Sequence, residues 1–219
     1  MSSVLSRHRS FWTQEHRRSL YVGLLLLSLA IVVQVGAGRY SARSATNFVG
    51  DIFLDNLPLV NVDIIVVQGA FIFLTTALLL ALYKPRYILL GIKAAALFIL
   101  IRAFFISLTH IGIYPQQITF NTGLPGEELY HLLDFQANFF FSGHTGMPLL
   151  FAFIFWPEKF WRHFFMAVSL LMAVSVLLAR VHYSIDVFAA PFMTYCIFQI
   201  TQKLFPEDYK LVSDPETKL

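Results

Sequence analysis

Apolar residues gather into long runs along the chain, separated by shorter stretches that are polar or charged. Each run approaches the roughly 20 residues that a helix needs to cross about 30 Å of hydrocarbon. Because lipid cannot satisfy exposed backbone groups, and because the runs lack the alternation of barrel strands, the pattern predicts transmembrane helices. The six runs lie at residues 20–37, 64–83, 87–107, 138–156, 163–179 and 184–204.

This pattern predicts an all-α fold, a six-transmembrane-helix bundle that forms one membrane domain over residues 20–204. A basic N-terminal segment at 1–19 precedes it, and a C-terminal tail at 205–219 follows it. The composition agrees, since 57% of the residues are hydrophobic and only 13% are charged, against roughly a quarter charged in soluble domains. We therefore expect a membrane-embedded protein with no nucleic-acid partner, and homo-oligomerisation stays open.

Lysine and arginine are unevenly divided between the two sides of the predicted bundle. Most of the 16 fall before the first run, in the short connections at 84–86 and 157–162, or near and after the end of the sixth run. Cytoplasmic segments are enriched in these residues, so both termini are expected in the cytoplasm. The long connections at 38–63 and 108–137 are then extracytoplasmic, and long loops in a compact protein tend to carry function.

The sequence Phe-Ser-Gly-His-Thr at 141–145 stands near the outer end of the fourth run. Ser142 is a favourable N-cap residue, and Gly143 lets the backbone approach a ligand closely. A helix that starts here directs free N–H groups and the positive end of its dipole outward, which suits an anion such as phosphate. His144 is expected beside that anion. The alternative is an ordinary capped helix with an interfacial histidine.

A second polar motif, Arg-Val-His-Tyr-Ser-Ile-Asp at 180–186, leads into the sixth run. His182 and Asp186 are four residues apart and therefore share one face of any helix that includes both. A carboxylate that accepts from one imidazole nitrogen fixes the tautomer and leaves the other nitrogen free as a base or nucleophile. Arg180 offers a planar, permanently charged fork for phosphate. The alternatives are a purely structural His182–Asp186 hydrogen bond and an arginine at the membrane edge.

Together the two motifs, FSGHT followed by HYSID, resemble the sphingomyelin synthase-related branch of the type 2 phosphatidic acid phosphatase (PAP2) superfamily. Two further stretches agree with this resemblance. Asp51 and Asp55, with the Asn-Leu-Pro that follows, resemble the first signature of the family, and Arg102 followed by Thr109 resembles its second. Asn138 departs from the family pattern, which commonly has aspartate at that position.

The resemblance implies a metal-independent double displacement that uses no cofactor. His182 is expected to attack phosphorus, oriented by Asp186, and to form a phosphohistidine. His144 is expected to protonate the departing oxygen and later to deprotonate the acceptor. For Asp51 and Asp55 a role in loop structure is an equal alternative, and for Arg102 the alternative is a side chain that extends to the membrane surface. The residues expected to bind substrate are Arg180, Arg102, Ser142, Gly143, Asp51, Asp55 and Tyr183.

Phosphatases of this superfamily carry a Lys-x6-Arg-Pro signature that the present sequence lacks, since Lys93 and Arg102 are spaced differently and no proline follows. The resemblance therefore favours transfer of a phospho-head group, of the phosphocholine or phosphoethanolamine type, from a glycerophospholipid donor. The expected acceptor is a lipid alcohol such as ceramide or diacylglycerol, and the expected site is extracytoplasmic. Two alternatives remain: a lipid phosphate phosphatase or phospholipase C-like hydrolase, and a non-catalytic transporter or scaffold.

Overall fold

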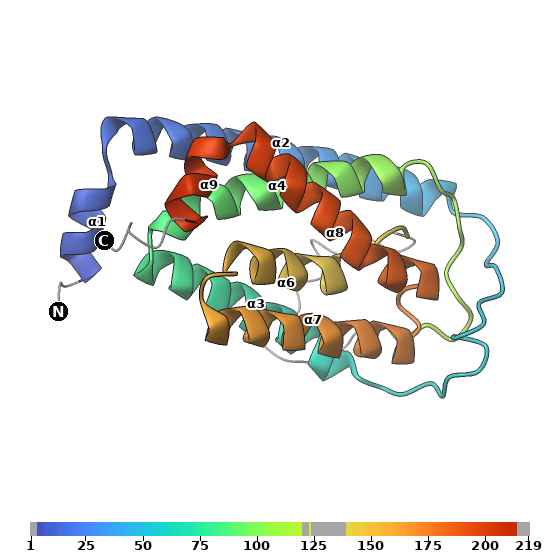
Figure 1. Ribbon diagram of the computed structural model, residues 1–219. Helices are drawn as coiled ribbons and strands as arrows, with labels where there is room; N and C mark the ends of the chain where they lie inside the picture. Colours follow the sequence, from blue (N-terminus) through green and yellow to red (C-terminus); the bar gives the residue numbers. More distant parts are fainter. Residues whose placement is uncertain (1–3, 120–122, 124–138, 214–219) are drawn as a thin grey trace.

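The computed structural model of the protein describes residues 4–119, 123 and 139–213. Throughout these residues the regular secondary structure is helical, without strands, which confirms the predicted all-α fold. The long helices lie side by side in a bundle, with two short helices, α1 and α9, at one end of it (Figure 1). In chain order the helices are α1 (Val4–Phe11), α2 (Gln14–Ser44), α3 (Asp63–Tyr83), α4 (Arg86–Ile106), α6 (Gly143–Ile154), α7 (Lys159–Leu178), α8 (Ser184–Leu204) and α9 (Pro206–Ser213).

Within the described residues, five helices are long and apolar enough to cross a membrane: α2, α3, α4, α7 and α8. Their outward side chains are largely apolar, as contact with lipid requires. Leu25 on α2 is 71% exposed, for example, and Phe192 on α8 is 75% exposed. These helices indicate an integral multi-pass membrane protein.

The fourth predicted run differs from the observed helix. α6 begins at Gly143 and has 12 residues, or about 18 Å at 1.5 Å per residue, which is less than the roughly 30 Å of a bilayer core. Ser142 sets this start, because its Oγ accepts the N–H of Thr145 at 3.3 Å as an N-cap. Residue 138, where the predicted run begins, lies outside the described residues. The structure therefore has five candidate spans and one shorter apolar helix.

α2 extends beyond the predicted run at 20–37 in both directions. Its N-terminus is capped by Thr13, whose Oγ1 accepts the N–H of His16 at 3.2 Å, and the helix continues to Ser44. α2 packs along α4. The approach is close at Gly23, where a Cβ atom would lie 3.2 Å from Ile92 Cγ2.

α6 lies inside the bundle, packed against α4, α7 and α8 (Figure 1). Aromatic side chains fill much of the space around it, and many of them meet edge to face, a favourable geometry for aromatic pairs. This packing fixes the short helix and hence the position of His144 in its first turn. The buried aromatic residues of this core are Phe73, Tyr87, Phe98, Phe141, Phe155, Phe165 and Phe198.

A buried polar cluster ties α2, α4 and α9 together at the end where α1 lies. Lys93 of α4 is 4% exposed and donates to Asp208 of α9 and, at 2.6 Å, to Ser19 Oγ of α2. Ser19 Oγ in turn donates to the other oxygen of Asp208 at 2.8 Å. Each charged group is thus paired and hydrogen-bonded, as burial of an ion pair requires. The N-termini of α6 and α8 lie at the opposite end of the bundle (Figure 1).

Two loop segments run next to each other at that opposite end. The N–H of Thr46 donates to the carbonyl of His110 at 2.9 Å, and the N–H of Gly112 donates to the carbonyl of Asn47 at 3.0 Å. A Cβ atom on residue 112 would lie 2.4 Å from the carbonyl oxygen of Thr46, so this contact requires glycine. The segment after α2 is thereby held against the segment after α4.

Candidate active site

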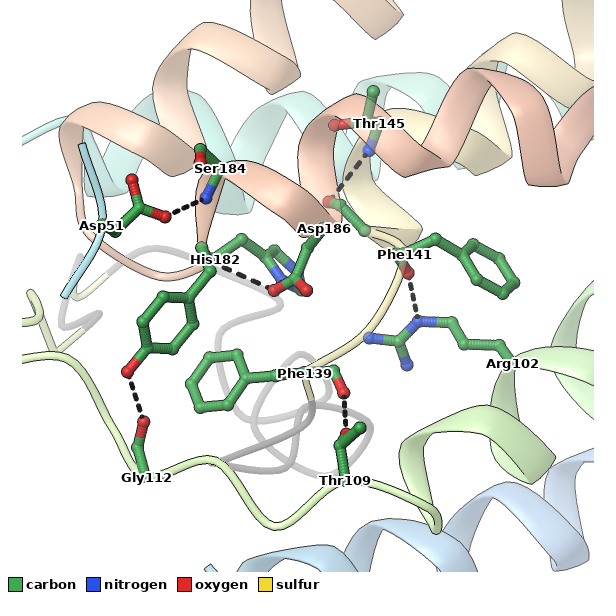
Figure 2. A network of polar contacts seen from close by, with 12 residues as sticks. Asp51, Arg102, Thr109, Gly112, Phe139, Phe141, Thr145, His182, Ser184 and Asp186 are labelled. Atoms are coloured by element: carbon green, nitrogen blue, oxygen red, sulfur yellow. Dashed lines mark hydrogen bonds and ion pairs between the residues drawn. The ribbon is translucent and has the colours of Figure 1, made fainter. Parts of the chain in front are cut away.

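Two histidines and an aspartate from separate segments meet at the end of the bundle opposite α1 and α9. The ring centroids of His144 and His182 are 5.9 Å apart, with 66° between the ring planes. His182 Nδ1 lies 3.1 Å from Asp186 Oδ2 (Figure 2). His182 is 4% exposed and Asp186 is 2% exposed. The structure thus brings together the three residues that sequence spacing marks as catalytic.

The turn between α7 and α8 orients the His182–Asp186 pair. Asp186 Oδ2 also accepts the N–H of Tyr183 at 3.2 Å, as acidic residues in the first turn of a helix often do. Asp51, from the loop after α2, accepts the N–H of Ser184 at 2.7 Å (Figure 2). Two carboxylates therefore satisfy backbone donors at the start of α8, which holds His182 directly before the helix.

The start of α6 is joined to the first turn of α8. The N–H of Ser142 donates to the carbonyl of Asp186 at 2.9 Å, while Ser142 Oγ caps the N–H of Thr145. These two bonds set the first turn of α6, and His144 with it, beside His182. The positive end of the α6 dipole consequently faces the site, where it favours an anion.

Arg102 enters the site from the last turns of α4. Its side chain is buried, and Nε donates to the carbonyl of Phe141 at 3.1 Å (Figure 2). Seven residues later, Thr109 Oγ1 donates to the carbonyl of Phe139 at 3.0 Å (Figure 2). The two residues of the second family-like stretch therefore hold the backbone that leads into Ser142 and His144. A buried guanidinium beside the two imidazoles also supplies positive charge for a phosphate.

Burial and charge act on His182 in the same direction. Removal of the ring from water, and secondarily the charge of Arg102, lower the pKa of His182 to about 3. The imidazole is therefore neutral at physiological pH. Because the Asp186 carboxylate accepts only, Nδ1 is assigned the proton, and Nε2 carries the free lone pair that a nucleophile needs.

A family comparison agrees with this geometry. Residues 137–204 match the family model described as PAP2 superfamily C-terminal. The match supports membership of the PAP2 superfamily. Since that superfamily generally comprises phosphatases and phosphotransferases, the match also supports an enzyme. Comparison with curated proteins found no significant match, and neither did comparison with solved structures.

The PAP2 match contains the histidines and Asp186, whereas Asp51, Asp55 and Arg102 lie outside it. The departure at Asn138 falls inside the matched range but outside the described residues. Among the residues that the structure does describe, no three His, Cys, Asp or Glu side chains gather as metal ligands would.

Asp51 and Asp55 lie in the loop between α2 and α3, which contacts the start of α8. Besides Ser184, Asp51 accepts the N–H groups of Phe53 at 2.9 Å and Leu54 at 3.1 Å. Asp55 accepts the N–H of Asp51 at 3.1 Å. Through these backbone contacts both carboxylates stabilise the loop, and Asp51 also joins the loop to the start of α8.

Tyr183 is buried between the same loops. Its hydroxyl donates to the carbonyl of Gly112 at 2.8 Å (Figure 2) and accepts the N–H of Val49 at 3.3 Å. Burial raises the pKa of Tyr183 above its ordinary value. The side chain of Tyr183 therefore ties the start of α8 to the loop after α2 and to the loop after α4.

Arg180 lies at the rim of the site, beside a residue that the sequence did not mark. Its Nη1 donates to Gln116 Oε1 at 2.8 Å, and its guanidinium carbon is 5.4 Å from the ring centroid of Tyr114. Tyr114 in turn donates its hydroxyl to Asp55. Gln116 belongs to no sequence motif, so its contact with Arg180 becomes evident only in the folded loop.

Proposed function

We propose that the protein is an integral-membrane lipid phosphotransferase of the sphingomyelin synthase-related type. It moves a phospho-head group, of the phosphocholine or phosphoethanolamine type, from a glycerophospholipid to a lipid alcohol such as ceramide or diacylglycerol. The reaction passes through a phosphohistidine on His182 and needs no metal or cofactor. The site faces the extracytoplasmic side, which the placement of lysine and arginine toward the other end supports.

One observation carries the proposal: the His144 ring meets the His182–Asp186 pair at a ring-centroid separation of 5.9 Å. At this separation a single phosphate group can contact both imidazoles. The carboxylate of Asp186 holds the His182 ring, whereas His144 lies at the start of α6, so the two rings stand in different surroundings and can hold different protonation states. A transporter or scaffold has no need of this arrangement.

In the first step, His182 Nε2 attacks the phosphorus of the donor lipid. The bond between phosphorus and the diacylglycerol oxygen breaks, and His144, in its protonated form, gives its proton to that oxygen. Diacylglycerol leaves and the head group stays on His182. Arg102 and the N-terminus of α6 stabilise the negative charge on the phosphoryl oxygens.

In the second step, neutral His144 takes the proton from the acceptor hydroxyl. The acceptor oxygen attacks phosphorus, the bond between phosphorus and His182 Nε2 breaks, and both histidines return to their starting states. Asp186 keeps the His182 ring oriented throughout, because the carboxylate accepts from Nδ1.

The test uses the purified protein in nanodiscs that contain phosphatidylcholine or phosphatidylethanolamine together with ceramide or diacylglycerol. Mass spectrometry of the lipids is expected to show a new phospho-head-group lipid with the wild type and none with His182→Ala. The matched control is His163→Ala, which removes an exposed histidine near the start of α7, away from the site. If wild type and His182→Ala both gave no product with any lipid pair, the proposal would be wrong.

Hydrolysis is the second candidate, because the same phosphohistidine can react with water in place of a lipid alcohol. The same experiment separates the two. Release of free phosphocholine or phosphoethanolamine without an acceptor product, lost in His182→Ala, would assign the protein as a phospholipase C-like hydrolase. Transfer to the acceptor with little free head group would assign it as a transferase.

A further inference from the structure

Two non-glycine residues among those described adopt a left-handed backbone: Gln116, with φ of 61°, and Arg180, with φ of 57°. Arg180 occupies the C-terminal turn of α7. Its N–H donates to Leu177 O at 3.0 Å, and the next N–H, of Val181, donates to Val176 O at 2.9 Å. In this turn glycine is the usual residue, because a Cβ atom disfavours the left-handed region. The backbone alone therefore favours glycine at position 180, where the chain has arginine.

The side chains of these two residues meet. Arg180 Nη1 donates to Gln116 Oε1 at 2.8 Å, and the guanidinium lies against the Tyr114 ring. A guanidinium can only donate, so the amide oxygen of Gln116 faces it and the amide NH₂ group points elsewhere. The remaining polar atoms of the pair are all donors. Such a pair suits a ligand that supplies acceptor oxygens and negative charge, as phosphate does.

The pair is separate from the reacting centre. The arginine whose charge acts on His182 is Arg102, which is buried beside the two imidazoles. Arg180 is half-buried in the turn between α7 and α8, two residues before His182, and Gln116 is exposed in the loop after α4. The carboxylate that Tyr114 contacts, Asp55, accepts the Tyr114 hydroxyl and the N–H of Asp51. Arg102 thus lies beside the two imidazoles, whereas Arg180 lies in the turn before α8.

We propose that Arg180, oriented by Gln116, forms a capture subsite that binds the head-group phosphate of the donor phospholipid before it moves inward to His182. This inference rests on the proposed function. A contact made with the incoming lipid, and given up before the chemical step, strengthens substrate binding without lowering the barrier of that step. Because the contact is absent from the transition state, loss of the subsite raises KM for the donor and raises kcat by a similar factor, so that kcat/KM changes little. Gln116 is a positioning residue, because it acts through Arg180.

Arg180→Gly is a sharp test, because it removes the guanidinium and installs the residue that the backbone prefers. The thermal midpoint is expected to stay the same or to rise. KM for the donor lipid is expected to rise roughly tenfold, the effect of losing one charge-assisted hydrogen bond, with kcat/KM within about twofold. Gln116→Gly relieves the second left-handed residue and is expected to raise KM in the same direction by a smaller factor.

The matched control is Arg43→Ala, which removes an exposed arginine from the C-terminal turn of α2, at the same end of the bundle. It is expected to leave KM unchanged. This result would distinguish binding at the subsite from a general electrostatic attraction between arginines at this end and the anionic phosphate. An unchanged KM in Arg180→Gly would overturn the proposal. A fall in kcat as large as the fall in kcat/KM would also overturn it, because Arg180 would then act on the reacting phosphate itself.

A binding measurement tests the subsite without turnover. Dihexanoyl phosphatidylcholine is titrated into His182→Ala protein with and without Arg180→Gly, and the second protein is expected to bind it more weakly. Inorganic phosphate is titrated in parallel. Equal binding of the lipid by both proteins, or an Arg180 effect on inorganic phosphate alone, would overturn the proposal. Absence of turnover in the wild type would sink the proposed function, while this titration would still decide the subsite.

Discussion

In the proposed reaction His182 attacks phosphorus only in its neutral form, and its surroundings favour that form. Burial and the charge of Arg102 lower the pKa of His182 to about 3, from an ordinary value of 6.5. Protonation of the nucleophile therefore begins to slow the reaction only at strongly acidic pH. His144 has the opposite requirement, since it must carry a proton to release the leaving group. The two requirements give the pH dependence a definite shape.

Burial, and then the charges of His182 and Arg102, also lower the pKa of His144 to about 3. We therefore predict that kcat/KM rises as the pH falls from about 7 to 5, because a larger share of His144 then carries the proton that the leaving group needs. The profile is measured with a neutral acceptor and a phosphocholine donor, so that neither substrate titrates in this range. An acid limb with its midpoint near 6.5 would mean that His182 titrates as an ordinary histidine. A rate that stays constant to high pH would remove His144 as the acid.

Asp51 links the loop after α2 to the catalytic helix through a carboxylate that must be ionised to accept all of its backbone donors. Although burial raises it, the N–H groups of Ser184, Leu54 and Phe53 lower the pKa of Asp51 below 3.8 overall. A carboxyl with a lower pKa in the folded chain stabilises the fold above pH 3.8. That stability is lost as the pH falls through the folded-state value.

We predict that Asp51→Asn lowers the free energy of unfolding by about 1–3 kcal/mol at pH 7, the cost of weakened hydrogen bonds to a charged group. The difference from wild type is expected to shrink as the pH falls below 3.8, where Asp51 itself becomes protonated. Thermal unfolding in detergent between pH 3 and 7 measures both. The control is Asp63→Asn, which changes an exposed or half-buried carboxylate at the start of α3. A pH-independent difference would contradict the prediction.

Sequence spacing, together with the two motifs, was enough to predict that His144, His182 and Asp186 lie close together, although His182 precedes α8 instead of sharing a helix face with Asp186. It was not enough to assign Asp51, whose bond to Ser184 joins residues that are 133 positions apart. Gln116 was missed for a different reason. Its signal is a backbone angle, and that angle depends on the folded loop around it rather than on its neighbours in sequence.

At the scale of single elements, the starts of α6 and α8 matter most, since each presents a catalytic residue. The sixth predicted run at 184–204 coincides with α8, because the polar motif before it marks the helix start clearly. The fourth run began too early. Phe139, Phe140 and Phe141 are apolar, so hydropathy counted them as helix, whereas Arg102 and Thr109 hold the carbonyls of Phe141 and Phe139. Hydrophobicity cannot distinguish aromatic residues inside a helix from aromatic residues in the segment that precedes it.

Two helix caps of the same kind allow a matched test of whether the start of α6 sets the position of His144. Ser142 caps α6 next to the site, and Thr13 caps α2 at the other end. We predict that Ser142→Ala and Thr13→Ala each lower the free energy of unfolding by about 1 kcal/mol. Only Ser142→Ala is expected to lower kcat, by roughly tenfold or more, because only that cap sets the position of His144.

Thermal unfolding and transfer assays on the two variants check this expectation side by side. If both variants lost the same fraction of kcat, the loss would reflect general destabilisation rather than the position of His144. If neither lost activity, the cap would be dispensable for placing the histidine, and the bond between Ser142 N–H and the Asp186 carbonyl would suffice.

At the scale of the whole molecule, the hydropathy pattern predicted the helix bundle but not the contacts of the terminal segments with it. The terminal segments were expected only as a basic stretch and a tail, yet each contains a short helix that packs on the bundle. Asp208 of α9 is buried against Lys93 of α4, 115 residues away. Neither residue has a sequence pattern that reveals the other. An ion pair of this kind follows from the assembled bundle, not from local periodicity.

The two ends of the bundle make the orientation of the molecule testable. In a Cys196→Ser background, Ile52→Cys puts a thiol on the exposed loop near the site, and Lys210→Cys puts one on α9. Lysine and arginine gather toward the α9 end, which predicts that this end is cytoplasmic. In sealed vesicles whose extracytoplasmic face points outward, a membrane-impermeant maleimide is therefore expected to label Ile52→Cys at once and Lys210→Cys only after permeabilisation. The reverse pattern would put the histidines on the cytoplasmic side, and the donor and acceptor lipids would then have to come from the cytoplasmic leaflet.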